Sequence, residues 1–100
     1  MTGDADNFAL KREMGCTREE FLRWLPGATR HAPMQMSADK AVVHAGDATV
    51  EISFTQAPPR TIALVSLPVL KVSFRFSGAD ARARREFMAY FDLYTKRGGG

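Results

Sequence analysis

The stretch AVVHAGDATVEISFT, residues 41–55, decides the fold. Gly46-Asp47 separates two β-rich runs, and a two-residue connection of this kind is typical of a tight hairpin because glycine adopts the positive φ that such turns need. From Val50 to Phe54 apolar and polar residues alternate, so one face of the second run is apolar and the other polar. The stretch therefore predicts an antiparallel hairpin that buries one face against another element. The two expected strands are Ala41–Ala45 and Ala48–Thr55.

The residues that follow predict a loop and then more extended chain. Gln56–Arg60 contains two consecutive prolines, which do not fit a central strand, so we expect a loop there. Between Thr61 and Phe76 the even positions are largely apolar, while the odd positions are apolar only as far as Val69. We therefore expect residues 63–69 to be buried on both faces, with Pro68 marking a bend, a bulge or a turn. The later part should bury one face and expose a basic row.

Two helices are expected, one on each side of this β-rich region. Thr17-Arg-Glu-Glu20 is a capping box, and Pro26-Gly27 should end the short helix that follows. Ser77-Gly-Ala-Asp80 repeats the capping pattern ahead of an amphipathic helix of about five turns. The apolar face of that helix centres on Phe87, and the three terminal glycines should stop it.

These elements together predict an α+β fold in one domain. An antiparallel sheet of three or four strands should be flanked by the short N-terminal helix and by the longer C-terminal amphipathic helix, which packs on one sheet face. We expect a flexible N-terminal arm over 1–15, a single α+β domain over 16–97, and a flexible glycine tail over 98–100. The helix residues Phe87, Phe91 and Tyr94 should meet Val50, Ile52, Phe54, Val72 and Phe74 of the sheet.

The composition is that of a single globular domain. The chain has 100 residues, of which 45% are hydrophobic and 25% charged, as is usual for one soluble globular domain. A single cysteine excludes a disulfide framework within the chain. The acidic N-terminus has no apolar segment of the secretory type, and no apolar run is long enough to cross a bilayer. We expect a cytoplasmic protein that does not associate with membranes.

The sequence favours neither catalysis nor metal binding. Cys16 lies beside a helix start, where a thiol pKa can fall, but no base or orienting acid accompanies it, so we expect no catalytic residues, no cofactor and no enzyme activity. Thioether, thiol and imidazole groups suit Cu(I), yet methionine also fills apolar cores, and no cysteine pair supports a site. We therefore predict no metal site. The soft donors are Met14, Cys16, His31, Met34, Met36 and His44.

The chain ends in Lys96-Arg-Gly-Gly-Gly100. In its last residues it is similar to ubiquitin-like modifiers and sulfur carriers, and the resemblance covers Gly99-Gly100 and the preceding basic pair. It implies a carrier whose terminal glycine is activated. Those proteins lead into the tail from a strand, whereas here an amphipathic helix precedes it, and a glycine helix stop explains the same residues.

Charge is unevenly placed along the chain. Residues 1–59 carry six basic and eight acidic side chains (net −2), and residues 60–100 carry eight and three (net +5). Such a basic half is a hint of an anionic partner. The expected order helix, three strands, helix is similar to that of double-stranded-RNA-binding domains, and this resemblance implies RNA as a partner. The residues that would bind an anion or RNA are Lys71, Arg75, Arg82 and Arg85.

The preferred hypothesis is a small binding module whose partner is another protein or a second copy of the chain. Met88 and Leu93 flank the apolar face of the last helix and are the expected contact residues. Alternatively, they pack within the monomer against the first helix. RNA binding ranks second because a helix packed on the apolar sheet face would leave Lys71 and Arg75 on the far side of the molecule.

Overall fold

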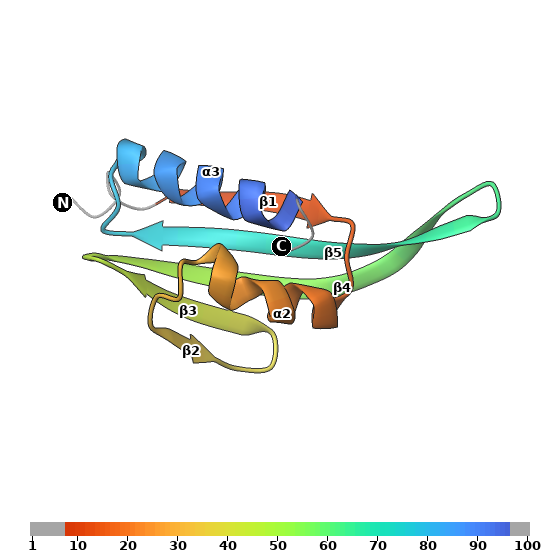
Figure 1. Ribbon diagram of the computed structural model, residues 1–100, viewed down its shortest axis with the longest axis horizontal. Helices are drawn as coiled ribbons and strands as arrows, with labels where there is room; N and C mark the ends of the chain where they lie inside the picture. The colour runs from red at the N-terminus through yellow and green to blue at the C-terminus, as the bar shows by residue number, and fades with distance from the viewer. Residues whose placement is uncertain (1–7, 97–100) are drawn as a thin grey trace.

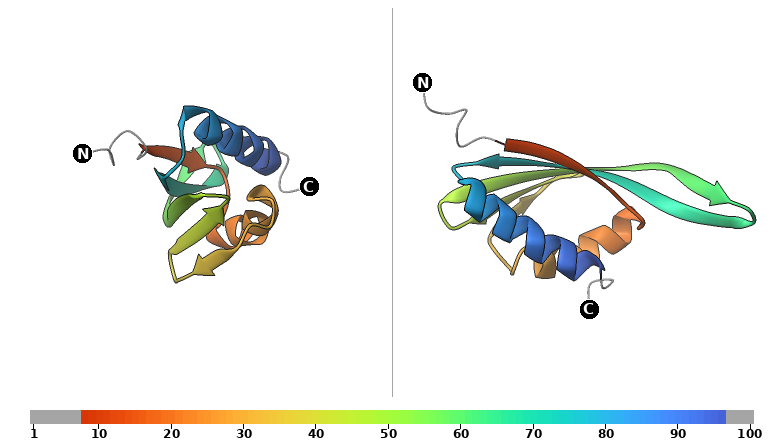
Figure 2. Two further views of the ribbon diagram at one scale, coloured as in Figure 1. Left: turned by 90° about the vertical axis from the view of Figure 1, so that its left-hand side faces the viewer. Right: turned by 90° about the horizontal axis from the view of Figure 1, so that it is seen from above.

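The computed structural model describes residues 8–96 of the chain. Its sheet has five antiparallel strands in the order β1-β5-β4-β3-β2, and both helices lie on one face of it (Figure 1, Figure 2). The α+β class is confirmed, but the sheet is larger than the three or four strands expected. The elements are β1 (Phe8–Met14), α2 (Arg18–Ala28), β2 (Met34–Met36), β3 (Lys40–Ala45), β4 (Ala48–Ile62), β5 (Val65–Ser77) and α3 (Ala81–Lys96).

The extra strand is β1, in the stretch for which a flexible arm is expected from the sequence. It pairs antiparallel with β5, from Phe8 opposite Phe76 to Met14 opposite Leu70. Most of its side chains are exposed, so the strand owes its place to the hydrogen-bonding edge that β5 offers rather than to its own apolar pattern. Residues 1–7 and the predicted glycine tail lie outside the described residues.

The hairpin expected at Gly46-Asp47 is confirmed. β3 and β4 pair from Ala45 opposite Ala48, and Gly46 has a φ of +63°. Such a φ is easily adopted by glycine, which has no side chain to clash with the backbone. Upstream of this hairpin, residues 34–36 form the edge strand β2, which pairs with β3.

The predicted loop over residues 56–60 is wrong. β4 continues through it to Ile62, with a register shift between Ala57 and Arg60 that accommodates Pro58 and Pro59. The prolines are tolerated because neither edge of β4 needs their missing N–H groups: β3 pairs only as far as Ser53, and the register shift leaves Pro58 and Pro59 unpaired with β5. Pro68 lies within β5, and the turn between the two strands falls at residues 63–64.

Both helices begin at a side chain that caps the first turn. At α2 the Glu20 N–H donates to Thr17 Oγ1 (3.1 Å) and the Thr17 N–H donates to Glu20 Oε1 (2.8 Å), which confirms the capping box. Before α3, however, it is Asp80 rather than Ser77 that caps, because its Oδ1 accepts from the Ala83 N–H at 2.8 Å.

The expected stop of α2 at Pro26-Gly27 is wrong, since the helix runs on to Ala28. A Cβ added to Gly27 would lie 2.1 Å from the Tyr94 hydroxyl of α3. Gly27 therefore lets the two helices approach closely, a packing role rather than a helix stop. Thr29 closes the helix by donating its hydroxyl to the Leu25 carbonyl at 2.9 Å.

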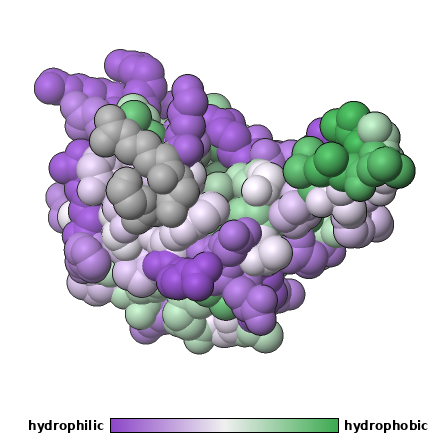
Figure 3. All heavy atoms as spheres, turned by 45° about the vertical axis from the view of Figure 1, so that its right-hand side comes forward, coloured by the Kyte–Doolittle hydropathy of each residue, from purple (hydrophilic) through white to green (hydrophobic). Residues whose placement is uncertain are grey.

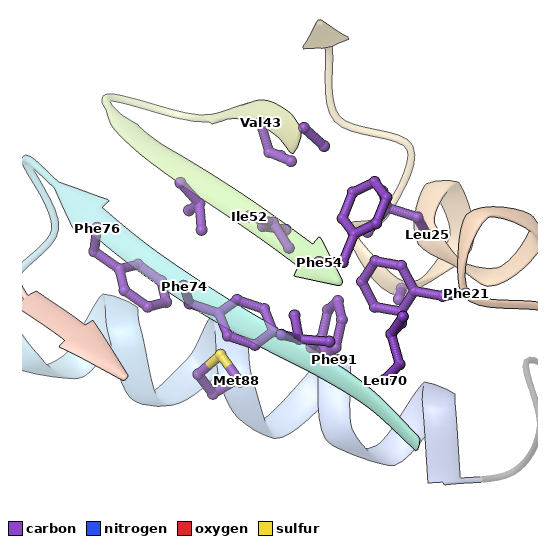
Figure 4. Packing of buried hydrophobic residues seen from close by; sticks show 14 of the residues in the cluster. Phe21, Leu25, Val43, Ile52, Phe54, Leu70, Phe74, Phe76, Met88 and Phe91 are labelled. Atoms are coloured by element: carbon purple, nitrogen blue, oxygen red, sulfur yellow. The ribbon is translucent and has the colours of Figure 1, made fainter. Parts of the chain in front are cut away.

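Phenylalanine rings fill the space between the helices and the sheet (Figure 4). Phe91 of α3 meets Phe74 edge to face at 4.9 Å between ring centroids. Phe87 and Phe76 make a similar contact at 5.5 Å. The α3 packing on β5 agrees with expectation, but Phe54 of β4 contacts Phe21 of α2, at 5.2 Å. Each helix thus covers its own part of the apolar sheet face.

Replacing Phe91 by Ala should lower the free energy of unfolding by about 3–5 kcal/mol, because a fully buried ring leaves a cavity among other rings. Urea denaturation followed by far-UV circular dichroism measures the loss. Leu93→Ala on the same helix is the matched control, since Leu93 is 50% exposed and should cost less than about 1 kcal/mol. A loss for Phe91→Ala as small as that of the control would contradict this packing.

Candidate functional site

The most distinctive feature of the molecule is a hairpin arm, residues 56–69, formed by the end of β4 and the start of β5. β1 accompanies β5 only as far as Leu70, and β3 accompanies β4 only as far as Ser53. Beyond these points the two strands pair with each other alone and project from the body (Figure 1). The arm gives the molecule extents of 51 × 27 × 25 Å.

The end of the arm is apolar and open to solvent. Leu64 is 100% exposed, and three further aliphatic residues beside it are between 43% and 57% exposed. They form the green patch at the end of the projection in Figure 3. We call this set the apolar tip: Ile62, Leu64, Val65 and Leu67.

The expectation that residues 63–69 are buried on both faces is therefore wrong. The apolar run is present, but no element of the described chain covers its outer end. An apolar pattern shows that side chains gain by leaving water, and it does not say which surface receives them. The missing cover is what makes this segment a candidate site.

The strand register places most of the apolar tip on one face of the arm. Ile62 lies opposite Val65, and two residues further along Arg60 lies opposite Leu67. The intervening pair, Thr61 and Ser66, points to the other face because side chains alternate along a strand. The arm is thus two-sided: one face is apolar apart from Arg60, and the polar back carries Thr61 and Ser66.

The turn at the tip is built from unusual residues. Two-residue hairpin turns favour Asn, Asp and Gly, which tolerate positive φ and keep the turn polar. Here the turn residues are Ala63 and Leu64, and Ala63 has a φ of +55°. A non-glycine residue in this region costs about 1–2 kcal/mol. The sequence of the tip is therefore not optimised for turn formation or for solubility.

Prolines restrict how the arm can engage another molecule. An exposed two-stranded ribbon offers free N–H and C=O groups to an incoming strand. Pro58, Pro59 and Pro68 lie on the two strands of the arm and lack the N–H that such pairing needs. The exposed groups that the arm offers are thus the side chains of the apolar tip rather than its backbone edges.

The base of the arm is held by a polar clip around Gln56. Its side-chain Nε2 donates to the Val69 carbonyl at 2.9 Å, and its Oε1 accepts from the Arg18 N–H at 2.7 Å. A salt bridge between Arg60 and Glu13 (3.2 Å) adds a second tie to β1. These contacts direct the arm relative to the body. The bond to Arg18 joins residues 38 positions apart, so no local sequence signal reveals it.

A second apolar surface lies between the end of α2 and the middle of α3. We call it the helix groove; it comprises two adjoining depressions of about 250 and 700 Å³ that share Arg30, Phe87 and Tyr90. The Arg30 guanidinium stacks over the Tyr90 ring at 4.2 Å from its centroid. Leu93 lines the groove, whereas Met88 is only 6% exposed and belongs to the core. Of the two expected contact residues, Leu93 alone is at the surface.

The four basic residues predicted to bind an anion lie on two sides of the molecule. Lys71 and Arg75 are exposed on the open sheet face, because they alternate with buried Val72 and Phe74. Arg82 and Arg85 lie on α3, which covers the opposite face, and Arg82 pairs with Glu86 at 3.1 Å.

The open sheet face brings Arg75 together with basic residues that were not predicted as a site. A shallow hollow of about 590 Å³ there is lined by Lys11, Lys40 and Arg75 together with Ser53 and Ser73. Lys40 already pairs with Glu51 at 3.3 Å. The hollow is polar because every second side chain of these strands faces the open side of the sheet, and most of these side chains are polar. This alternation can be read from the sequences of β4 and β5 but not from that of β1.

Cys16 is buried at the start of α2. Burial and the nearby Glu20 carboxylate raise the pKa of its thiol to about 11, which keeps the sulfur protonated at neutral pH. Among the described residues, no three His, Cys, Asp or Glu side chains are grouped as a metal site would require. Between residues 8 and 96, neither helix is long and apolar enough to span a membrane.

No family model matches the sequence, and no curated protein or solved structure is significantly similar to it.

Stability should fall at alkaline pH because of Cys16. The raised pKa means that the folded state holds the thiol proton more tightly, so its stabilisation is complete below about pH 8.5 and disappears as the pH rises toward 11. Relative to Cys16→Ala, the native chain should lose about 2 kcal/mol more of its unfolding free energy between pH 8 and pH 10.5. Urea denaturation at both pH values measures this, and equal losses in the two proteins would show that the thiol is not shielded.

Proposed function

We propose that this chain is a small non-enzymatic protein-interaction module whose docking element is the apolar tip of the hairpin arm. The observation that carries the proposal is the complete exposure of Leu64 at the end of a projecting ribbon, with Ile62 and Val65 more than half exposed beside it. Contiguous apolar side chains on a soluble surface usually mark a contact with another molecule.

The free energy gained by burying the apolar tip suits a contact of moderate strength. Burial of a fully exposed Val, Leu or Ile side chain contributes about 1.5–3 kcal/mol. Because Ile62, Val65 and Leu67 are already about half buried, the four residues together contribute about 4–8 kcal/mol before any cost of association. The translational and rotational freedom given up on binding opposes this gain. The clip at Gln56 reduces the further cost of ordering the arm, because the arm is already directed before it binds.

The position of Cys16 supports a non-enzymatic role. It is the one thiol of the chain, and burial together with a raised pKa keeps it from acting as a nucleophile. The apolar tip and the helix groove consist mainly of apolar side chains, which suit binding rather than catalysis.

Anion or RNA binding is the second candidate, and the hollow on the open sheet face favours it. Its lining includes three cationic side chains and two serines, which are groups that contact phosphate, together with Glu51, which pairs with Lys40. The face also carries Glu13 and Glu51 opposite Lys71 and Arg75, which weakens its attraction for an anion. Most aromatic side chains of the sheet point to the core rather than outward, so bases have little stacking surface there.

A photoreactive residue at the tip tests the main proposal. With p-benzoylphenylalanine in place of Leu64, irradiation of cells expressing the chain should give a discrete protein–protein adduct on a denaturing gel, because the tip is held against its partner. The same residue in place of Lys71, exposed on the open sheet face, is the matched control and should give no comparable adduct. Absence of any protein adduct at position 64 would overturn the proposal.

Titration with short single- and double-stranded RNA at two ionic strengths tests the second candidate. We expect binding no tighter than about 10⁻⁴ M, the weak end of non-specific association, because the basic residues are split between two faces. Micromolar affinity that falls steeply with salt, and that weakens in Arg75→Ala but not in Arg85→Ala, would instead identify the open sheet face as the site.

A further inference from the structure

We infer that the partner of the apolar tip is a second copy of this chain, and that the tip of each copy docks in the helix groove of the other. The inference rests on the proposed function and adds the identity of the partner and of the receiving surface. It is carried by the exposed apolar side chains that pairing would cover, by the chemistry of the groove and by the placement of the two surfaces.

A reciprocal contact would cover both apolar surfaces of each copy. The large apolar side chains exposed among the described residues include the four of the tip and Leu93 of the groove. A partner that received only the tip would leave the groove uncovered, whereas a second copy covers both surfaces at once.

The helix groove has the chemistry to receive the tip. Its apolar lining consists of alanines, the half-buried Phe87 and Tyr90 rings, and the exposed Leu93. The smaller depression has a volume of about 250 Å³, which a branched aliphatic side chain such as that of Leu64 can enter. Tyrosine and arginine, both present in this groove as Tyr90 and Arg30, are enriched among the residues that contribute most to protein interfaces.

The two surfaces cannot meet within one molecule. The tip lies at the far end of the arm, whereas the groove lies beside the end of α2 and the middle of α3, toward the other end of the body (Figure 1). Two copies related by a two-fold axis can each insert a tip into the other's groove. Such a reciprocal contact closes on itself and covers both apolar surfaces without forming a filament.

Sedimentation velocity of the full chain over a range of about 1–500 μM tests the pairing, with expected dissociation in the micromolar range. Leu64→Asp and Ala89→Asp should each weaken association at least ~100-fold, because each places a charge in an apolar contact. Ser66→Asp is the matched control: it adds the same charge on the polar back of the arm, and the dimer should persist. All three substitutions are at exposed positions, so the variants should remain folded, and far-UV circular dichroism checks this.

Mixing the two variants tests the proposed geometry. Leu64→Asp keeps an intact groove and Ala89→Asp keeps an intact tip, so an equimolar mixture should recover part of the association through one intact contact. A wild-type dimer without such recovery would overturn docking of the tip in the groove.

Failure of the dimer and failure of the proposed function are distinguishable. A chain that stays monomeric throughout the concentration range overturns the second-copy proposal, while an adduct from position 64 to a different protein would preserve the interaction module. Flotation with anionic lipid vesicles tests a lipid surface as the alternative partner. A native chain that is monomeric and binds the vesicles, together with a Leu64→Asp variant that does not bind them, would overturn the proposal in favour of a lipid surface.

Discussion

The antiparallel pairing of β4 with β5 is the contact on which the rest of the structure depends. It runs from Thr49 opposite Ser77 to Ile62 opposite Val65, and the other strands attach to the outer edges of this pair. Its buried residues, such as Ile52 and Phe74, form the floor of the core. The helices then cover that floor with their own aromatic side chains, among them Phe21 and Phe91.

The hydrogen-bond ladder between β4 and β5 extends through both the body and the arm, but the helices cover it only in the body. At the body end, α2 and α3 remove the apolar face from water, and residues such as Phe74 are fully buried. At the arm end the same ladder continues past both helices, and Leu64 is fully exposed. The hydrophobic effect acts on both ends alike, so the arm retains a driving force for association that the body has already used in folding.

The clip around Gln56 connects these two ends. Its bonds to the Arg18 N–H and the Val69 carbonyl join the start of α2 to the base of the arm. The neighbouring Cys16 is buried in the same corner. The start of α2 is therefore one of the anchors that hold the base of the arm to the body.

Local physics determined much of this protein from sequence alone. The alternation from Val50 to Phe54, the turn at Gly46-Asp47 and the capping box at Thr17 depend on near neighbours, and the structure confirms each of them. Tertiary structure alone decided that β1 joins the sheet, that Met88 is core while Leu93 is surface, and that residues 63–69 project from the body. The physical reason is that an apolar pattern records a gain from leaving water, whereas the surface that supplies the cover is set by contacts between residues far apart in the chain.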